Sequence, residues 1–412
     1  MDCLELLKNK ADKENFQKLI ALQNPSVYEF IAEFVKLVNP KSIFVRTDSP
    51  KDIEYIRKRA TELGEERVLA TSGHTFHFDG CFDQARDKKN TKYLIPAGQY
   101  YGHYLNSIER KKGLDEIRGY LKDIMGDKEM FVCFFCLGPL DSAFSILAVQ
   151  LTDSSYVAHS EDILYRGAYE QMVKSKSKDF FRFVHSAGQL HKGVSKNIEQ
   201  RRVYIDLEKE TVYSTNTQYA GNTVGLKKLA LRLAIRKASQ EGWLAEHMFI
   251  MGVHNRKGQK AYLCGAYPSM CGKTSTALTP GESVIGDDIA YLRKNQGKVF
   301  AVNVERGVFG IIKDVNSKDD PIIWNGLTQK GEVIFSNVLI DEKGIPFWIG
   351  KDKRMPPRGI NFAGEWYPGK TDKEGCEIPP SHKNARYTVR LSALDNVDEH
   401  LEEPSGAEVK GI

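Results

Sequence analysis

Apolar and polar residues follow a helical period in the first part of the chain. Residues 24–40 (NPSVYEFIAEFVKLVNP) place apolar side chains at helical spacing between two Asn-Pro pairs, which predicts a helix. The run SIFVRT at 42–47 then predicts a strand. Residues 49–65 predict a second helix, with Ser49 at its N-cap and Pro50 at its first position. A strand that is followed by a helix indicates α/β layers.

A similar pair of elements follows further along. Residues 110–128 (RKKGLDEIRGYLKDIMGDK) predict an amphipathic helix, and the apolar run at 130–140 (MFVCFFCLGPL) predicts a strand. This strand contains Cys133 and Cys136 in a C-x-x-C pattern. A redox or zinc site would need a turn here, and usually a second pair of cysteines. The flanking Phe and Val residues favour two small apolar thiols inside a buried strand.

The residue composition of the chain changes near residue 214. A loop of small residues at 214–225 (STNTQYAGNTVG) precedes a predicted helix that ends at Gly242. Strands are then predicted at 246–253 and 257–268. The predicted helix, which precedes both strands, has one apolar face made of Leu226, Leu229, Ala230, Leu233 and Ala234.

This change indicates two domains. We expect an N-terminal domain at residues 1–240 and a second domain at residues 241–412. In the second domain, the runs at 283–292 (SVIGDDIAYL) and 298–304 (KVFAVNV) predict a hairpin around Asn295–Gly297.

The stretch GAYPSMCGKTSTAL at 265–278 carries a signal for phosphate binding. Gly272-Lys273-Thr274 matches the end of the pattern G-x-x-x-x-G-K-[ST], although Tyr267 stands where the first glycine belongs. A strand before the loop and a helix after it are the context of a phosphate loop. Amides at a helix N-terminus bind anions, Lys273 would add charge, and Thr274 would offer a hydroxyl to a nucleotide's metal. The alternative is a Gly-Lys pair in an ordinary turn.

Three other groups have side chains suited to a polar site. Asp287 and Asp288 end an apolar run, and such carboxylates bind hard cations or lie in a solvated turn. His247 lies between a helix and a strand, where a histidine is more often structural than a ligand. Asn384 and Arg386 are donors that could hold a carboxylate or a phosphate.

Composition excludes several classes of protein. The 412 residues are 41% hydrophobic and 27% charged, as is usual for a globular protein, and the net charge of +5 is too small to indicate nucleic-acid binding. The sequence contains no run of eighteen apolar residues, so we expect no membrane span. The N-terminus has no apolar signal core. Seven dispersed cysteines argue against a disulfide framework, so we expect a reducing cytoplasm.

Six segments combine into one family pattern: YAGNTVGLKK, GWLAEHM, YPSMCGKTS, IGDDIAY, NVERGVFG and SHKNARYTV. In this order they resemble the GTP-dependent phosphoenolpyruvate carboxykinases. The segments DQARDKKNT and LGPLDSAFSILAVQLTDSSYVAHS also resemble that family's N-terminal domain, so the likeness runs from about residue 80 to the end. Cys271, which stands just before the G-K-T, favours the GTP-using class over the ATP-using one.

The resemblance implies an α/β fold of two domains. One is an N-terminal substrate domain, and the other is a P-loop-type nucleotide domain with a mixed sheet. The family converts oxaloacetate and GTP to phosphoenolpyruvate, GDP and CO2 through an enolate that a metal stabilises, a step of gluconeogenesis. It implies one Mn2+ per site, with Mg2+ or Mn2+ on the nucleotide. We expect no nucleic-acid or membrane partner, and a monomer if the chain is complete.

The resemblance also implies a metal site of one lysine, His247 and Asp288. Lysine is an unusual ligand because it must lose its proton to bind. Counting forward from Tyr219 makes Lys228 the ligand and Lys227 its substrate-facing neighbour. Counting back from His247 gives Lys227, because this chain is one residue shorter than the family pattern there. We favour Lys228.

The remaining roles are carried over from the same family. Substrate binding is implied for Arg86, Tyr219, Ala220, Gly221, Lys227, Ser269, Asn384 and Arg386, although Ala220 stands where the family has glycine. Nucleotide binding is implied for Met270, Cys271, Gly272, Lys273, Thr274, Ser275 and Arg386. Catalysis is implied for Cys271, Lys273 and Arg386, although the thiol of Cys271 could instead only pack in its loop.

The end of the chain departs from the family pattern. After EPSGAEVKGI the family has a strand, a Gly-Gly-Arg segment, the guanine pocket and a mobile lid. We therefore expect the C-terminal third to be missing, with unpaired sheet edges at the chain's end. The alternative function is an incomplete piece that binds metal and ligand and needs a partner chain for the lid and guanine pocket. A kinase built on the same loop would leave Arg86, His247 and Asn384 without a purpose.

Overall fold

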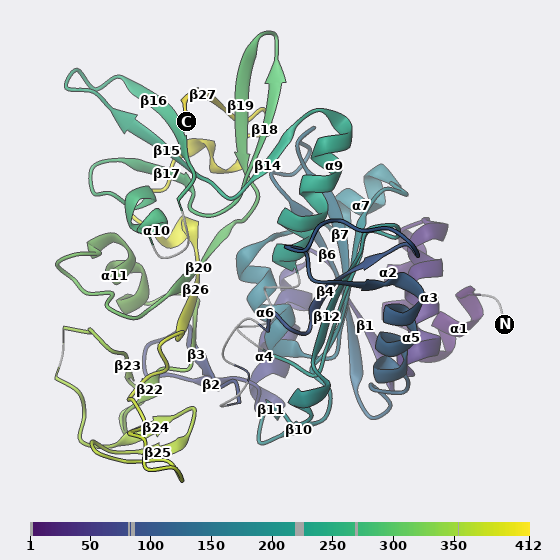
Figure 1. The fold of residues 1–412 in the computed structure, drawn as a ribbon, viewed down its shortest axis with the longest axis horizontal. Coiled ribbons are helices and arrows are strands. Elements are labelled where there is room, and N and C mark those ends of the chain that lie inside the picture. Colours follow the sequence, from purple (N-terminus) through teal and green to yellow (C-terminus); the bar gives the residue numbers. More distant parts are fainter. Residues whose placement is uncertain (1–2, 81–82, 84–86, 219–225, 268–270, 353) are drawn as a thin grey trace.

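The structure is a computed structural model, and it describes residues 3–80, 83, 87–218, 226–267, 271–352 and 354–412. Two halves lie side by side (Figure 1). Most of the first 240 residues form the half on the right, and most of the later residues form the half on the left. A mixture of helices and sheets in both halves confirms the α/β class.

The first half is built on one large mixed sheet. Its described strands follow the order β1-β6-β7-β9-β13-β12-β4-β5, and β8 pairs with β6. Continuous apolar runs such as the one in β6, which contains three Phe residues, suit strands that are covered on both faces. The strands are β1 (Ser42–Arg46), β4 (Thr91–Ile95), β5 (Ser107–Glu109), β6 (Glu129–Leu137), β7 (Ile146–Thr152), β8 (Arg166–Gly167), β9 (Phe181–Ser186), β12 (Arg202–Asp206) and β13 (Thr211–Thr215).

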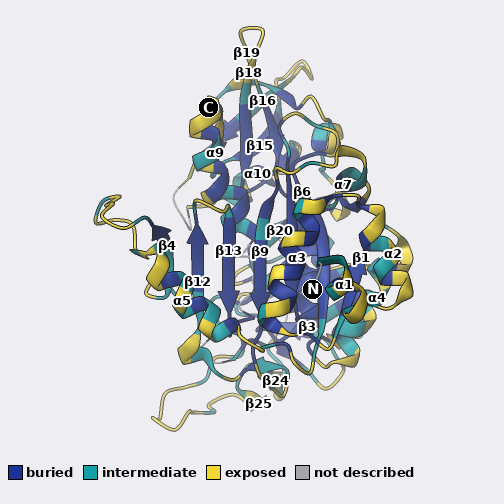
Figure 2. Cartoon of the chain, turned by 90° about the vertical axis from the view of Figure 1, so that its right-hand side faces the viewer, coloured by how far each residue is buried: buried dark blue, intermediate teal, exposed yellow. Residues whose placement is uncertain are grey.

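Helices cover both faces of this sheet, and buried residues fill its strands (Figure 2). Alternate residues of β6 point to opposite faces, so Met130, Val132 and Phe134 join one core and Phe131 and Phe135 the other. The helices are α1 (Cys3–Lys10), α2 (Lys13–Ala21), α3 (Pro25–Val38), α4 (Pro50–Glu62), α5 (Arg110–Leu121), α6 (Ser155–Leu164) and α7 (Tyr169–Ser175). A small hairpin, β10 (Leu190–His191) and β11 (Val194–Ser195), and a short 3-10 turn at Ile198–Gln200 complete this half.

Local sequence signals account for several of these elements. The side chain of Ser49 accepts a hydrogen bond from the amide of Asp52, and Pro50 is the first residue of α4, which confirms the predicted cap. Cys133 and Cys136 are both buried and unpaired, and they belong to the cores on opposite faces of the sheet. The prediction of a buried strand rather than a redox or zinc pair is therefore confirmed.

The second half contains a mixed sheet of seven described strands in the order β14-β18-β19-β27-β16-β15-β17. The strand nearest the end of the chain, β27, lies inside this sheet, parallel to β16 and antiparallel to β19. The expectation of unpaired edges at this strand is wrong, because both of its edges are paired. The strands are β14 (Leu244–Glu246), β15 (Phe249–His254), β16 (Lys260–Gly265), β17 (Ser283–Gly286), β18 (Ala290–Asn295), β19 (Lys298–Asn303) and β27 (Ala407–Gly411).

The predicted hairpin around Asn295–Gly297 is correct only in its second part. β18 and β19 pair through a turn in which Gln296 and Gly297 both have positive φ. The apolar run before them is not one strand, because β17 ends at Gly286 and pairs with β15 instead. The break leaves Asp287 and Asp288 between two strands that pair with different neighbours.

A smaller sheet joins the two halves. Its order is β2-β3-β21-β26-β20, and β3 from the first half pairs in parallel with β21 from the second. Helix α6 packs between this sheet and the large one, and all ten of its residues are buried. The strands are β2 (Arg67–Val68), β3 (His74–His77), β20 (Gly307–Ile311), β21 (Val333–Ser336) and β26 (Arg386–Arg390). A separate four-stranded sheet contains β22 (Leu339–Ile340), β23 (Pro346–Phe347), β24 (Gly359–Asn361) and β25 (Gly364–Trp366).

The helix predicted after residue 226 begins with a wider turn than expected. A π-helical turn, η3 (Lys228–Leu233), leads into α9 (Ala234–Glu241), which ends at Gly242 in the left-handed conformation. The other described helices of the second half are α10 (Lys273–Ala277), α11 (Pro321–Thr328) and two 3-10 turns at Leu391–Ala393 and Glu399–Glu402. In the described part of the chain, no helix has both the length and the apolar run that a bilayer crossing requires.

Candidate functional site

Three side chains from distant parts of the sequence meet at the carboxylate of Asp288. Asp288, between β17 and β18, accepts a hydrogen bond from His247 Nε2 at 2.7 Å. Its carboxylate also contacts the ammonium groups of Lys227 and Lys273, and the main-chain oxygen of Asp288 accepts a second bond from Lys273 at 3.0 Å. His247 and Asp288 therefore lie together, and Lys227, one of the two candidate lysines, contacts Asp288.

The charges in this cluster oppose the effect of burial. Burial would raise the pKa of Asp288, but Lys227, His247 and Lys273 hold it well below its usual range. Burial and the neighbouring charge of Asp288 raise the pKa of Asp287 to about 6. Burial would lower the pKa of Lys227, but Asp288 and Glu305 raise it, so Lys227 carries a proton here. The imidazole of His247 is 43% exposed, which leaves one side of the cluster open.

The local sequence explains how the two aspartates reach this place. A side-chain carbon on Gly286 would lie 2.2 Å from Oδ1 of Asn303, so only glycine fits where β17 passes that residue. The amide of Asn303 donates in turn to the main-chain oxygen of Glu305. Gly286 is the last residue of β17, so Asp287 and Asp288 follow directly after this close contact.

The G-K-T segment lies directly beside the two aspartates. β16 leads into it and α10 begins at Lys273, which confirms the predicted strand, loop and helix. Gly272 has φ of 83° with open space around its α-carbon, so it supplies the left-handed turn that starts the helix. Thr274 donates from its hydroxyl to Asp287 at 3.0 Å. Cys271 is exposed, as a thiol that contacts a ligand in this loop would need to be.

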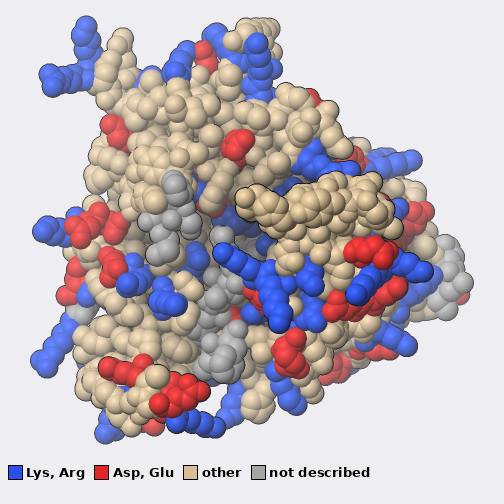
Figure 3. All heavy atoms as spheres, viewed as in Figure 1, with Lys and Arg blue, Asp and Glu red and all other residues tan. Residues whose placement is uncertain are grey.

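A cavity of about 670 Å³ opens in front of these groups. It is lined by polar residues from the loop and the aspartate pair, and by apolar residues from β20 and α11. Lysine and arginine side chains gather around the hollow between the two halves (Figure 3). The predicted residues that line it are Lys227, His247, Gly272, Lys273, Thr274, Ser275, Asp288 and Arg386.

Arg386, the first residue of β26, lines the cavity, and Asn384 stands two residues before it in the chain. The guanidinium of Arg386 lies 5.0 Å from the ring centre of Phe309, and its Nε is buried without a hydrogen-bond partner among the described residues. The amide N–H of Asn384 donates to His382 Nδ1 at 3.1 Å. A guanidinium that has a buried, unused donor is suited to an anionic ligand.

Of two further acidic residues near the cluster, Glu305 had no role in our sequence analysis, and Asp287 was considered there only together with Asp288 as a possible cation ligand. Asp287 accepts from Thr274, and Glu305 lies 3.6 Å from the ammonium of Lys227. Glu305 is buried, accepts a hydrogen bond from Tyr165 at 3.2 Å, and has a pKa that burial raises to about 7. The paired aspartates in IGDDIAY and the glutamate in NVERGVFG were the signals that could have indicated them.

Several predicted residues lie outside the described part of the chain. These are Arg86, Tyr219, Ala220, Gly221, Ser269 and Met270. Lys228 is described, as the first residue of η3, and it is partly buried.

Comparison with known proteins identifies the family. Residues 29–239 match the phosphoenolpyruvate carboxykinase N-terminal domain, and residues 243–412 match the phosphoenolpyruvate carboxykinase C-terminal P-loop domain. The protein named phosphoenolpyruvate carboxykinase (GTP) from Pyrococcus abyssi is 54% identical over 412 residues, which cover 99% of this chain and 66% of that protein.

Two other relatives of the same name give similar values. The one from Thermococcus kodakarensis is 55% identical, and the matched region covers 100% of this chain and 66% of that protein. The one from Saccharolobus solfataricus is 47% identical, and the matched region covers 99% of this chain and 64% of that protein. The chain thus spans about two thirds of the length of these relatives. The two domain matches and these identities show that the chain belongs to the family of GTP-dependent phosphoenolpyruvate carboxykinases.

Proposed function

We propose that the protein converts oxaloacetate and GTP to phosphoenolpyruvate, GDP and CO2. The observation that carries this proposal is the meeting of Lys227, His247 and Asp288 directly beside the G-K-T loop, at one cavity. Decarboxylation needs groups that stabilise negative charge on the substrate, and phosphoryl transfer needs a site that binds the terminal phosphate. This arrangement offers both within one hollow.

A divalent metal ion meets the first of these two needs. The donor atoms are a lysine nitrogen, a histidine nitrogen and carboxylate oxygen, a mixed set that suits manganese. We propose Lys227 as the lysine ligand in place of Lys228, because Lys227 contacts Asp288. Lys227 must release its proton on binding, so binding should weaken as the pH falls. When bound, the metal supplies positive charge that stabilises negative charge developing on a nearby oxygen.

The loop residues act on the nucleotide. We assign Lys273 to the terminal phosphates, and Thr274 together with Asp287 to the metal that accompanies them, as Mg2+ or Mn2+. In this structure the ammonium of Lys273 contacts Asp288, so it must leave that carboxylate to reach a phosphate. Asp288 keeps Lys227 and His247 as partners when it does. Met270, Cys271 and Ser275 complete the proposed phosphate contacts.

Arg386 and Asn384 bridge the two reactants in this proposal. Arg386 lines the cavity and stacks on Phe309, which fixes the plane of its guanidinium. Its donors then face the transferring phosphoryl group, where charge spreads over the equatorial oxygens. Substrate binding by Arg86, Tyr219, Ala220, Gly221 and Ser269 remains a prediction from the family resemblance, as does the monomeric state.

The direct test supplies the protein with oxaloacetate, Mn2+ and GTP and measures phosphoenolpyruvate and pyruvate separately. We expect both products to exceed a blank that contains Mn2+ without protein, since decarboxylation without phosphoryl transfer yields pyruvate. Omission of GTP should remove phosphoenolpyruvate alone. The proposal fails if neither product exceeds the blank in a protein that is folded.

A further inference from the structure

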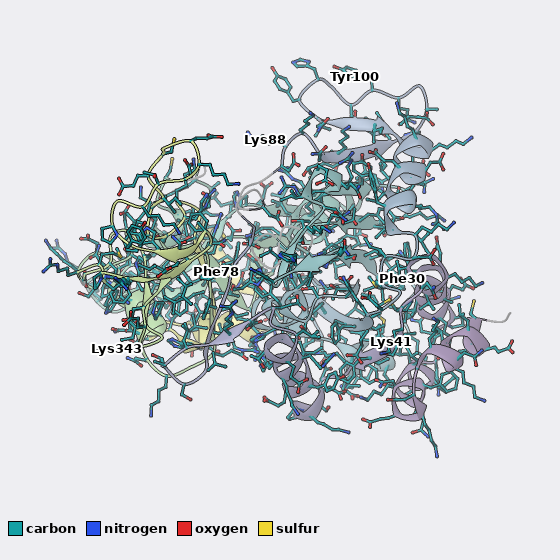
Figure 4. All side chains as sticks on the ribbon, turned by 90° about the horizontal axis from the view of Figure 1, so that it is seen from below. Phe30, Lys41, Phe78, Lys88, Tyr100 and Lys343 are labelled. Atoms are coloured by element: carbon teal, nitrogen blue, oxygen red, sulfur yellow. The ribbon has the colours of Figure 1, made fainter. Side chains whose placement is uncertain are left out.

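A single arginine joins the two ends of a five-residue segment in the first half. Nη1 of Arg201 donates to Asp83 at 2.6 Å, and its Nε donates to Asp87 at 3.1 Å. The two carboxylates thus flank residues 84–86 and share one guanidinium. Phe78 and Lys88, which are labelled in Figure 4, lie on the chain to either side of this segment.

Asp83 also holds a second segment. Its carboxylate accepts the hydroxyl of Thr217 at 2.7 and 2.9 Å and the amide N–H of Gln218 at 2.8 Å. Among the described residues, this side chain therefore accepts from Arg201, Thr217 and Gln218, and it is 1% exposed. A buried carboxylate with several charge-assisted or backbone bonds has a well-defined position.

The sheet gives these contacts a rigid base. Arg202, the first residue of β12, pairs with Thr215, the last residue of β13. Arg201 and Thr217 therefore leave the sheet at the same end. Asp87 is fixed in addition by Asn90, whose amide N–H donates to it at 3.0 Å.

We propose that Arg201 and Asp83 are positioning residues for oxaloacetate binding, because their contacts hold Asp83 and Asp87 in fixed places relative to Thr217 and Gln218. This inference rests on the proposed function, in which Arg86 and Tyr219–Gly221 bind the substrate. A planar guanidinium can hold both carboxylates at once, whereas an ammonium group lacks the fork for this. Neither residue needs to touch substrate.

The test compares two neighbouring arginines. Arg201→Lys keeps the charge and removes the fork. Arg202→Lys is the matched control, because the Arg202 side chain has nearly the same exposure, 16% against 14%, but pairs with Glu116 of α5. We expect Arg201→Lys to raise KM for oxaloacetate at least tenfold and to change kcat, Mn2+ affinity and GTP affinity by less than threefold. The control should leave all four within twofold.

Two outcomes of that comparison would overturn the inference. One is an unchanged KM in Arg201→Lys. The other is a parallel loss of Mn2+ and GTP affinity, which would show a general structural role.

A second measurement does not depend on activity. Hydrogen exchange of the Gln218 amide, which donates to Asp83, should be at least tenfold faster in Arg201→Lys than in the wild type or in Arg202→Lys. Unchanged exchange would overturn the inference even if the protein is an active carboxykinase. Faster exchange in a protein without carboxykinase activity would support the contact and refute the proposed function.

Discussion

His247 and Asp288 are 41 residues apart in the chain, and His247 Nε2 lies 2.7 Å from Oδ1 of Asp288. β14 and β18 bring them together, because Glu246 pairs with Ala290 in adjacent strands. The two side chains thus leave the same end of one strand pair. His247 directly follows β14 and Asp288 stands two residues before β18, so the pairing of these strands holds the two connections close together.

The first prediction concerns this pair. Asp288→Asn and His247→Ala should each weaken Mn2+ binding at least tenfold, or about 1.4 kcal/mol, because each removes one donor atom. Isothermal titration calorimetry with Mn2+ measures the affinity. Asp319→Asn is the control, since Asp319 lines the same cavity but does not share the contacts of Asp288. Wild-type affinity in both test variants would exclude this metal site.

The second prediction separates the two lysines. Lys227→Ala should reduce Mn2+ affinity at least tenfold, whereas Lys228→Ala should change it less than threefold, because Lys227 contacts Asp288. The same titration, repeated from pH 6 to pH 8, should show affinity rising with pH in the wild type as the lysine proton is released. The opposite ranking of the two variants would restore Lys228 as the ligand.

The third prediction concerns the phosphate loop. Lys273→Ala should lower GTP affinity at least tenfold and abolish phosphoryl transfer, because no other loop residue can supply its charge. The fold should persist, since Asp288 keeps Lys227 and His247 as partners. Fluorescence titration with GTP measures the affinity, and circular dichroism checks the fold. Lys298→Ala, at an exposed pair with Glu408, is the control. Equal GTP affinity in wild type and Lys273→Ala would mean that the loop has another purpose.

The fourth prediction concerns pH and stability at the junction of the two halves. Burial would lower the pKa of His159, but the carboxylates of Glu66 and Glu332 raise it to about 9. Arg57 also contacts Glu332 and opposes this rise. The folded protein thus holds a proton that the unfolded chain releases near pH 6.5. The resulting stability is complete below pH 6.5 and is lost as the pH rises through about 9, a change of up to ~3 kcal/mol.

Urea unfolding at pH 6, 7.5 and 9.5 measures this effect. His159→Gln should remove most of the loss between pH 6.5 and 9, because the amide has no proton to release. His191→Gln, at an exposed position, should keep the wild-type dependence. If His159→Gln and the wild type lose stability equally over this range, another group is responsible.

The sequence predicted the elements whose signals are local. The Ser49–Pro50 start of α4 and the left-handed Gly242 at the end of α9 depend on residues within one turn of each boundary. The run at 283–292 misled the prediction because its apolar character continues across a change of partner strand. That change depends on β14 and β15, which lie far from the run in the sequence.

The choice between Lys227 and Lys228 shows a second limit. The counts along the sequence from Tyr219 and from His247 differ by one residue, so they select different lysines. The π-helical turn η3 begins at Lys228 and contains more residues per turn, so it changes which side chains face the cavity. A sequence read alone gives no sign of this turn. His247 and Asp288 could be named as candidate ligands because short, distinctive motifs contain them.

Strand β3 has a consequence for how the molecule can be divided. The two family matches meet between residues 239 and 243, which invites separate production of each half. His74–His77 nevertheless pairs with Val333–Ser336, and the side chain of Phe76 is buried with Val333 and Phe335 in the core of the second half. A protein that starts at residue 243 would expose the edge of β21 and lose part of that core. The two halves are therefore separate in sequence but depend on each other to fold. When one half is exchanged with that of a relative, residues 67–77 should come from the same protein as the second half.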